Sequence, residues 1–404
     1  MSDPLEPAPV SDRVDVRWLN RGVAGIGSAS LLADVGHEIP TALLPSLLTS
    51  TLGAPAAALG VIEGVSDALA GAARFGGGAL ADDPHRPRTV AVGGYTATAI
   101  LSAGIGAATA TWQVALLRAG AWTARGLRVP SRNALLADIV PADKYGRAYG
   151  FERAMDNLGA IVGPLAAIAL VAAVGTRNAI LLSVIPGLLA AAAIIYAIRH
   201  TPRPHPQPRR PLRIRIRPVL VGPLRPLFTG ITAFELGNCA ATLLILRATE
   251  LLRPEHGLTT ATTIALALYV AYNAAATLTS LIAGHYTDRI GATRVLTLGV
   301  AAFALAYLGF TLDSNTWAAL LPWFLLAGIG IGCAETAQYA AVATHAPEHL
   351  RGSAFGLLAG VQSLGNLAAS GIAGLLWTML SPTWAFAYLA AWMLLALCAL
   401  ARTR

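Results

Sequence analysis

The stretch GHYTDRIGATR (284–294) repeats a motif that first occurs 206 residues earlier as GGALADDPHRPR (77–88). The residues that coincide under this shift are Gly78, Asp82 and Arg88 with Gly284, Asp288 and Arg294. The same shift aligns Gly146 and Gly150 with Gly352 and Gly356, in a second pair of loops. Because one offset serves two separate loops, the sequence predicts two parallel repeats.

The composition around these loops is that of a membrane protein. Of the 404 residues, 55% are hydrophobic and only 12% are charged, and the mean hydropathy is +0.60. A soluble domain carries about 25% charged residues, so this chain has too little charge for a water-soluble surface. These values exclude a soluble enzyme, a disordered chain and a nucleic-acid-binding protein. We expect no nucleic-acid partner despite the net charge of +8.

Apolar runs long enough to cross a bilayer recur along the chain. A hydrocarbon core of about 30 Å requires roughly 20 apolar residues as a helix. The sequence therefore predicts an all-α integral membrane protein of twelve transmembrane helices. The predicted spans are 22–48, 55–80, 90–109, 112–136, 148–172, 178–198, 224–250, 262–285, 295–312, 317–345, 353–378 and 382–401.

Cationic loop residues predict the orientation of these spans. They gather in the N-terminal segment and in every second loop, whereas the intervening loops hold only Arg177, Arg247 and Arg253. Positive residues mark the cytoplasmic side of a membrane. Both termini are therefore predicted to be cytoplasmic, in a multi-pass protein of the bacterial cytoplasmic membrane.

The chain is predicted to have four parts. A cytoplasmic N-terminal tail (1–21) precedes an N-terminal six-helix bundle (22–198), and a C-terminal six-helix bundle (224–404) ends the chain. The connection between them (199–223) is rich in Pro and Arg and has no helical period, so it is predicted to be a basic cytoplasmic linker. An alternative role for this linker is to bind anionic lipid headgroups.

Twelve spans, a central basic loop and duplicated loop motifs resemble the major facilitator superfamily. The signature of that family between spans two and three, and again between spans eight and nine, is G-x-x-x-D-R-x-G-R-R. The second copy here (284–294) matches it well, whereas the first copy (77–88) keeps the Gly, the Asp and the last Arg but lacks the Asp-Arg-x-Gly core. The resemblance covers residues 20–402 and implies the fold and the transport function of the family.

The duplicated motif is expected to form a gate on the cytoplasmic side. Its residues are Gly78, Asp82, Arg88, Gly284, Asp288, Arg289 and Arg294. An Asp at a helix N-terminus is favoured by the helix dipole and pairs readily with an Arg, so Asp288 is expected to latch the two bundles together. The alternative is a solvated loop charge. Because the first copy lacks the motif core, Asp82 is expected to matter less than Asp288.

A second motif lies in span five, where residues 157–167 read NLGAIVGPLAA. It resembles the glycine-proline motif of the drug/proton antiporter branch of the family and implies export. Gly159 and Gly163 are four residues apart and share a helix face, which allows close packing on a neighbouring helix, and Pro164 is expected to bend the span. Ordinary small-residue packing is the alternative.

Ionisable residues inside spans are costly and indicate a functional site. Asp34 and Glu38 share one face of span one, and Glu63 and Asp67 share one face of span two. Two like charges in a low-dielectric site do not both ionise easily, so one carboxyl of a pair is expected to load and release a proton. His37 is expected to point away from its acidic neighbours and to serve packing, with a proton relay as the alternative.

Arginines are expected to face these acids. Three lie within spans (Arg74, Arg118 and Arg125), and Arg118 and Arg125 share a face of span four that is expected to pair with carboxylates. The full set predicted for the proton-coupling and substrate cavity is Asp34, Glu38, Glu63, Asp67, Arg118, Arg125, Asp156, Glu235 and Glu335.

These features predict a secondary transporter that moves a small molecule by alternating access, with proton-coupled export as the first hypothesis. Proton-coupled uptake of a siderophore or metabolite is the alternative, and a non-transporting scaffold or sensor ranks lowest. The chain has no GxxxxGK[ST], HExxH or CxxC motif, so we expect no enzyme activity, no cofactor and no metal. Its partners are expected to be the cargo, protons and the lipid bilayer, and the protein is expected to function as a monomer.

Overall fold

The computed structural model describes residues 17–201, 212–220, 222 and 224–402. Most of the predicted N-terminal tail and the centre of the predicted linker (1–16 and 202–211) lie outside the described residues. All regular secondary structure in the described part is helical. The prediction of an all-α protein is therefore confirmed.

The first half of the chain forms six helices. Its first helix begins after Asn20, whose side chain accepts a hydrogen bond from the N–H of Val23 and so caps the free end. The helices are α1 (Arg21–Ser46), α2 (Ala56–Ala81), α3 (Pro87–Gly104), α4 (Thr111–Ile139), α5 (Tyr145–Leu182) and α6 (Val184–Arg199).

The second half follows a short helix, α7 (Ile216–Val219), in the predicted linker. Its helices are α8 (Leu224–Glu235), α9 (Ala241–Ile290), α10 (Ala292–Phe310), α11 (Trp317–His345), α12 (Arg351–Met379) and α13 (Pro382–Ala401).

The bounds of the observed helices differ from those of the predicted spans because several helices are broken. Gly175 in α5 and Gly257 in α9 have φ angles of 79° and 73°, so each long helix consists of two segments that meet at a residue type suited to this conformation. A further break at 236–240 separates α8 from α9, inside a stretch predicted to be one continuous span. A break in a membrane helix is tolerated where its backbone lies inside the protein or lines a cavity.

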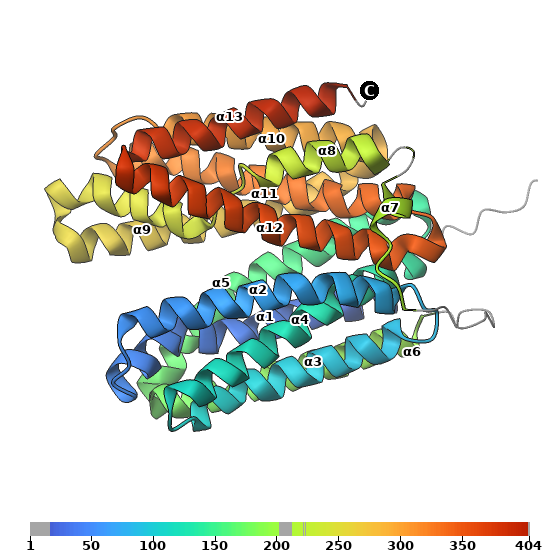
Figure 1. Cartoon of the computed structure of the whole chain (residues 1–404), viewed down its shortest axis with the longest axis horizontal. Helices are drawn as coiled ribbons and strands as arrows, with labels where there is room; N and C mark the ends of the chain where they lie inside the picture. Colours follow the sequence, from blue (N-terminus) through green and yellow to red (C-terminus); the bar gives the residue numbers. More distant parts are fainter. Residues whose placement is uncertain (1–16, 202–211, 221, 223, 403–404) are drawn as a thin grey trace, which may run out of the picture.

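The helices form two groups, α1–α6 and α8–α13, which Figure 1 shows in blue to green and in yellow to red. The groups meet near α7, and we call this end of the molecule the linker end. There α2 packs on α12 and α5 packs on α9. A Cβ at Gly78 would lie 2.9 Å from the Cα of Gly356, and one at Gly284 would lie 2.6 Å from the carbonyl oxygen of Gly146. Glycine at these positions lets the two halves touch through their backbones.

The same helices separate towards the opposite end of the molecule. A Cβ built at Gly60 or Gly64 of α2, or at Gly371 or Gly374 of α12, meets no atom within 4 Å. The space between the halves therefore narrows at the linker end and widens away from it, as the ribbons in Figure 1 indicate.

The outer surface is suited to lipid. Among the described residues, seven helices are long and apolar enough to cross a membrane. Large apolar side chains also point outward from both halves, among them Leu116, Ile168, Leu278, Leu298 and Leu375. An apolar surface of this extent is typical of a multi-pass membrane protein.

Candidate functional site

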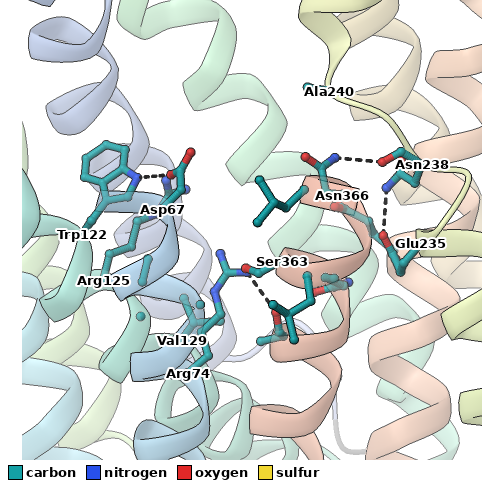
Figure 2. Close-up of a pocket in the computed structure, with 18 of the residues that line it drawn as sticks. Asp67, Arg74, Trp122, Arg125, Val129, Glu235, Asn238, Ala240, Ser363 and Asn366 are labelled. Carbon is teal, nitrogen blue, oxygen red and sulfur yellow. Dashed lines mark hydrogen bonds between the residues drawn. The ribbon is translucent and has the colours of Figure 1, made fainter. Parts of the chain in front are cut away.

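A cavity of about 510 Å³ lies between the two halves. Helices α1, α2, α4 and α5 form one wall, and α8, the break at 236–240, α11 and α12 form the other (Figure 2). Its charged lining residues are Asp34, Asp67, Arg74, Arg125, Arg128, Arg132, Arg153, Asp156, Glu235 and Glu335. Of the predicted cavity residues, six are among these, whereas Glu38, Glu63 and Arg118 lie outside the lining.

A chain of three titratable side chains follows α1. The ring of buried His37 lies between two carboxylates, with Nδ1 at 3.4 Å from Oδ1 of Asp34 and Nε2 at 3.3 Å from Oε1 of Glu38. The expectation that His37 points away from its acidic neighbours is therefore wrong. Its Nδ1 also lies 2.9 Å from the carbonyl oxygen of Ala33, which orients the ring between the two acids.

The glycines of the predicted span-five motif pack directly behind these acids. A Cβ at Gly159 would lie 2.6 Å from the Cβ of Asp34, and one at Gly163 would overlap the Cβ of Glu38. Glycine at both positions allows α5 to approach α1 closely. The motif therefore fixes where the two carboxylates stand relative to α5.

Arginines of α4 reach the acids of α1 and α2. Arg118 is buried and lies 3.0 Å from Glu63, while Arg125 lies 3.5 Å from Asp34. Between them Trp122 lies 3.4 Å from the guanidinium carbon of Arg118, measured to the ring centroid, and its Nε1–H donates to Asp67 at 2.8 Å.

A second buried network was not predicted. Arg132 contacts Glu152 at 2.8 Å, Arg153 contacts Asp156 at 3.0 Å, and Ser30 donates to Glu152. The prediction that only Arg74, Arg118 and Arg125 lie within spans is wrong, because Arg128, Arg132 and Arg153 are also buried in helices. Their position inside the predicted spans 112–136 and 148–172 was the signal that should have identified them.

The network crosses to the second half of the chain through Arg153. Its Nη1 lies 3.6 Å from Oε2 of Glu335 on α11, and its guanidinium carbon lies 5.1 Å from the ring centroid of Tyr339. Charges from both repeats therefore meet inside the cavity.

Glu235 sits at the end of α8, where the helix breaks. The residue is 2% exposed, and its carboxylate accepts hydrogen bonds from the side-chain amides of Asn238 and Gln338, each at 3.0 Å. Within the described chain no cation lies within 4.0 Å of it. Figure 2 shows Glu235, Asn238 and Asn366 across the cavity from Asp67 and Arg125.

The duplicated motif lies at the linker end. Asp288 accepts hydrogen bonds from the backbone N–H groups of Gly146 and Arg147, at 2.6 and 3.2 Å, in the first turn of α5. Burial raises the pKa of Asp288, and these two hydrogen bonds and the guanidinium of Arg147 oppose that rise. The aspartate thus caps a helix of the other half.

Asp82 makes the equivalent contacts on α12. Its carboxylate accepts hydrogen bonds from the backbone N–H of Ser353, at 2.9 Å, and from the Ser353 hydroxyl. Burial raises the pKa of Asp82, and the hydrogen bonds from Ser353 oppose that rise. The degenerate first copy of the motif therefore keeps its aspartate in the same place as the second copy.

In the described part of the chain, the arginines of the motif, unlike its aspartates, do not join the two halves. Arg289 and Arg294 are exposed, and no carboxylate of the described residues lies within 4.0 Å of either. The cation beside Asp288 is instead Arg147, at 3.5 Å, and Arg88 donates to the carbonyl oxygen of Thr201. A further contact between the halves joins Arg351 to Asp138 at 3.1 Å.

Two related helical halves around a charged cavity are typical of a membrane transporter. The family model of the Major Facilitator Superfamily matches residues 26–271 and 241–404, and the chain belongs to this superfamily. It is thus a secondary transporter that carries a small molecule across a membrane.

Three known proteins illustrate the similarity. An uncharacterized protein of Mycobacterium tuberculosis (strain ATCC 25618 / H37Rv) is 30% identical over 372 residues, which cover 88% of this chain and 86% of that protein. An uncharacterized MFS-type transporter of Methanocaldococcus jannaschii is 28% identical over 375 residues, 92% of each chain. The crystal structure of a bacterial homologue of the iron transporter ferroportin, in an outward-facing state, matches with a TM-score of 0.77 at 15% identity, over 95% of this chain and 99% of that one.

Proposed function

We propose that this transporter exports a small molecule across the bacterial cytoplasmic membrane in exchange for protons. The observation that carries the proposal is the cavity between the halves, where carboxylates of α1, α2, α5, α8 and α11 stand beside arginines. Buried ionisable groups on this scale are expensive in a membrane and are retained where they act on cargo or protons.

The orientation follows from the loops. We propose twelve spans in two six-helix bundles (22–198 and 224–404), with the linker end and both termini in the cytoplasm. The buried Arg128, Arg132 and Arg153 do not count as loop cations. Even without them, more cationic loop residues lie at the linker end than at the opposite end. The opposite end holds few arginines, and two of these contact other groups of the chain. Arg177 donates to the carbonyl oxygen of Ala108, and Arg247 contacts Asp313. On this orientation the described state is open to the outside.

Proton coupling is proposed to run through the three side chains of α1. Asp34 lines the cavity, and His37 touches both Asp34 and Glu38. A carboxyl that loads a proton from one side and releases it to the other must change its surroundings as the halves move. Gly159 and Gly163 hold these carboxylates against α5 of the same half, and Asp34 borders the cavity, so movement of the other half alters the surroundings of Asp34 directly.

Export is the proposed direction because these same two glycines belong to the motif that resembles the antiporter branch. The test is flux in proteoliposomes with an imposed pH gradient. Compounds that accumulate in cells lacking the gene are loaded as candidate cargo, and an internal pH-sensitive dye reports protons. Cargo and protons moving in opposite directions support export by antiport, whereas movement in the same direction indicates symport. Absence of flux for every such compound, with folded protein present, would favour the scaffold alternative.

A further inference from the structure

Arg128 is a buried cation with no partner of opposite charge. It lies on α4 with 3% of its surface exposed, and its Nε makes no hydrogen bond. Within the described chain, no carboxylate lies within 4.0 Å of its guanidinium. The other arginines of the cavity differ: Arg125, Arg132 and Arg153 contact acids, and Arg74 donates to the carbonyl oxygen of Ala359.

The acids near Arg128 contact its neighbours Arg125 and Arg132 instead. Arg125 and Arg132 lie about one turn to either side on the same helix. An arginine stays protonated in proteins, and burying it without a counter-charge is costly. The ring of Tyr95, whose centroid lies 3.9 Å from the guanidinium carbon, offsets only part of this cost by a cation–π contact.

The side chain is held in place by its neighbours. A Cβ at Gly94 of α3 would lie 2.5 Å from the Cβ of Arg128, so this glycine makes room for the arginine stem. Arg128 borders two spaces, the main cavity and a small inner chamber of about 10 Å³. The chamber has room for about one water-sized particle.

Two hydroxyls without hydrogen-bond partners belong to residues that line this inner chamber. Tyr95 and Ser102 are each 1% exposed, their hydroxyls have no partner in the structure, and both residues line the chamber together with Arg128. Buried donors of this kind normally have an acceptor. A buried guanidinium without a counter-charge, beside residues whose hydroxyls also lack partners, has the chemistry of an anion site.

We propose that Arg128 binds an anionic group inside the transporter. The group is either a small inorganic ion, on the chamber side, or the carboxylate or phosphate of a cargo molecule, entering from the main cavity. Either one supplies the missing counter-charge through charge-assisted hydrogen bonds. The proposal does not depend on the direction of transport or on proton coupling.

The test measures thermal unfolding of the purified full-length protein in detergent at constant ionic strength. HEPES, a bulky sulfonate without a carboxylate or phosphate, is the starting buffer anion and is replaced stepwise by bromide, by inorganic phosphate or by acetate. We expect saturable stabilisation by at least one of them. A response to bromide alone supports a small inorganic ion, and a response to phosphate or acetate supports the phosphate or carboxylate of a cargo molecule. No saturable response to any of the three overturns the proposal.

Three variants separate anion binding from folding. Arg128→Gln removes the charge but retains hydrogen-bond donors, and it should weaken the apparent affinity about tenfold or more, since a hydrogen bond to a charged group is lost. It should also unfold at a higher temperature than the native protein before any test anion is added, because an uncompensated charge is gone. Arg128→Lys should keep part of the response, and Arg225→Gln, at an exposed arginine outside every predicted motif, should keep all of it. A native response in Arg128→Gln would overturn the assignment.

Discussion

The carboxylate of Asp288 lies 2.6 Å from the backbone nitrogen of Gly146, so the last turn of α9 caps the first turn of α5. The free N–H groups at a helix N-terminus attract an anion, and here that anion comes from the other half of the molecule. A shift of 206 residues converts this contact into that of Asp82 with the start of α12. Two equivalent caps therefore hold the linker end closed.

Removing one cap should loosen the linker end. Asp288→Ala leaves the N–H groups of Gly146 and Arg147 without their acceptor, which costs about 1–2 kcal/mol and shifts the ratio of the two states about 5- to 30-fold. Asp288→Asn should do less, because its carbonyl still accepts one bond. The native cysteines are replaced, and spin labels are attached at positions 85 and 289. The distances between these labels measure the fraction of molecules in which the two halves have separated at the linker end.

Asp82→Ala should match Asp288→Ala in this measurement. The sequence led us to expect a smaller role for Asp82, but the structure gives it two hydrogen bonds from Ser353. We now expect the two variants to agree within about threefold, and the double variant to exceed either one. If the Asp82→Ala protein instead keeps the native spin-label distances, Asp82 matters less than Asp288, as the sequence predicted.

Glycine at the contact between the halves should be as important as the caps. Gly284→Ala places a Cβ 2.6 Å from the carbonyl oxygen of Gly146, closer than the two atoms can approach, so the backbones must separate. Gly371→Ala, at the wide end of α12, is the matched control because nothing lies within 4 Å of its Cβ. The spin-label distances should change for Gly284→Ala and stay native for Gly371→Ala. Equal effects would show that helix propensity, rather than contact between the halves, causes the change.

Topology is tested by labelling from outside intact cells. A cysteine at the exposed position Arg213, just before α7, should react with a membrane-impermeant maleimide only after the cells are permeabilised. A cysteine at the exposed position Asn315, between α10 and α11, should react without that treatment. The reverse pattern would place the linker end outside the cell and invert the proposed direction of opening.

The helical fold was accessible from the sequence because it depends on local properties. Lengths of apolar runs predict membrane helices, and the 206-residue repeat predicted two related halves. The break at 236–240 was not predictable in this way, because a short polar interruption such as Gly237-Asn238 resembles the packing residues found in many spans. The break is recognised only in the structure, where Asn238 donates a hydrogen bond to Glu235 at the cavity wall.

The cavity was predicted less completely, for a physical reason. Spacing along one helix places Asp34 beside Glu38, but it carries no information about which helices meet. The network of Arg132, Glu152 and Arg153 depends on contacts across α4 and α5, and the bond of Asp288 depends on contact between the halves. Pairing of charges from distant parts of the chain requires the tertiary structure.

Proton coupling through α1 gives the last prediction. Asp34→Asn and Glu38→Gln each remove one exchangeable carboxyl from the Asp34–His37–Glu38 chain but preserve the size of the side chain. Each should abolish cargo movement driven by a pH gradient, while exchange of labelled for unlabelled cargo without a gradient persists, because exchange needs no net proton transfer. Both activities are measured in proteoliposomes, with Glu348→Gln, at an exposed linker-end residue, as the control. If gradient-driven flux survives in both variants and in their double, α1 is not the proton site. The assignment would then move to Glu235, whose carboxylate accepts from two amides and has no cation within 4.0 Å among the described residues.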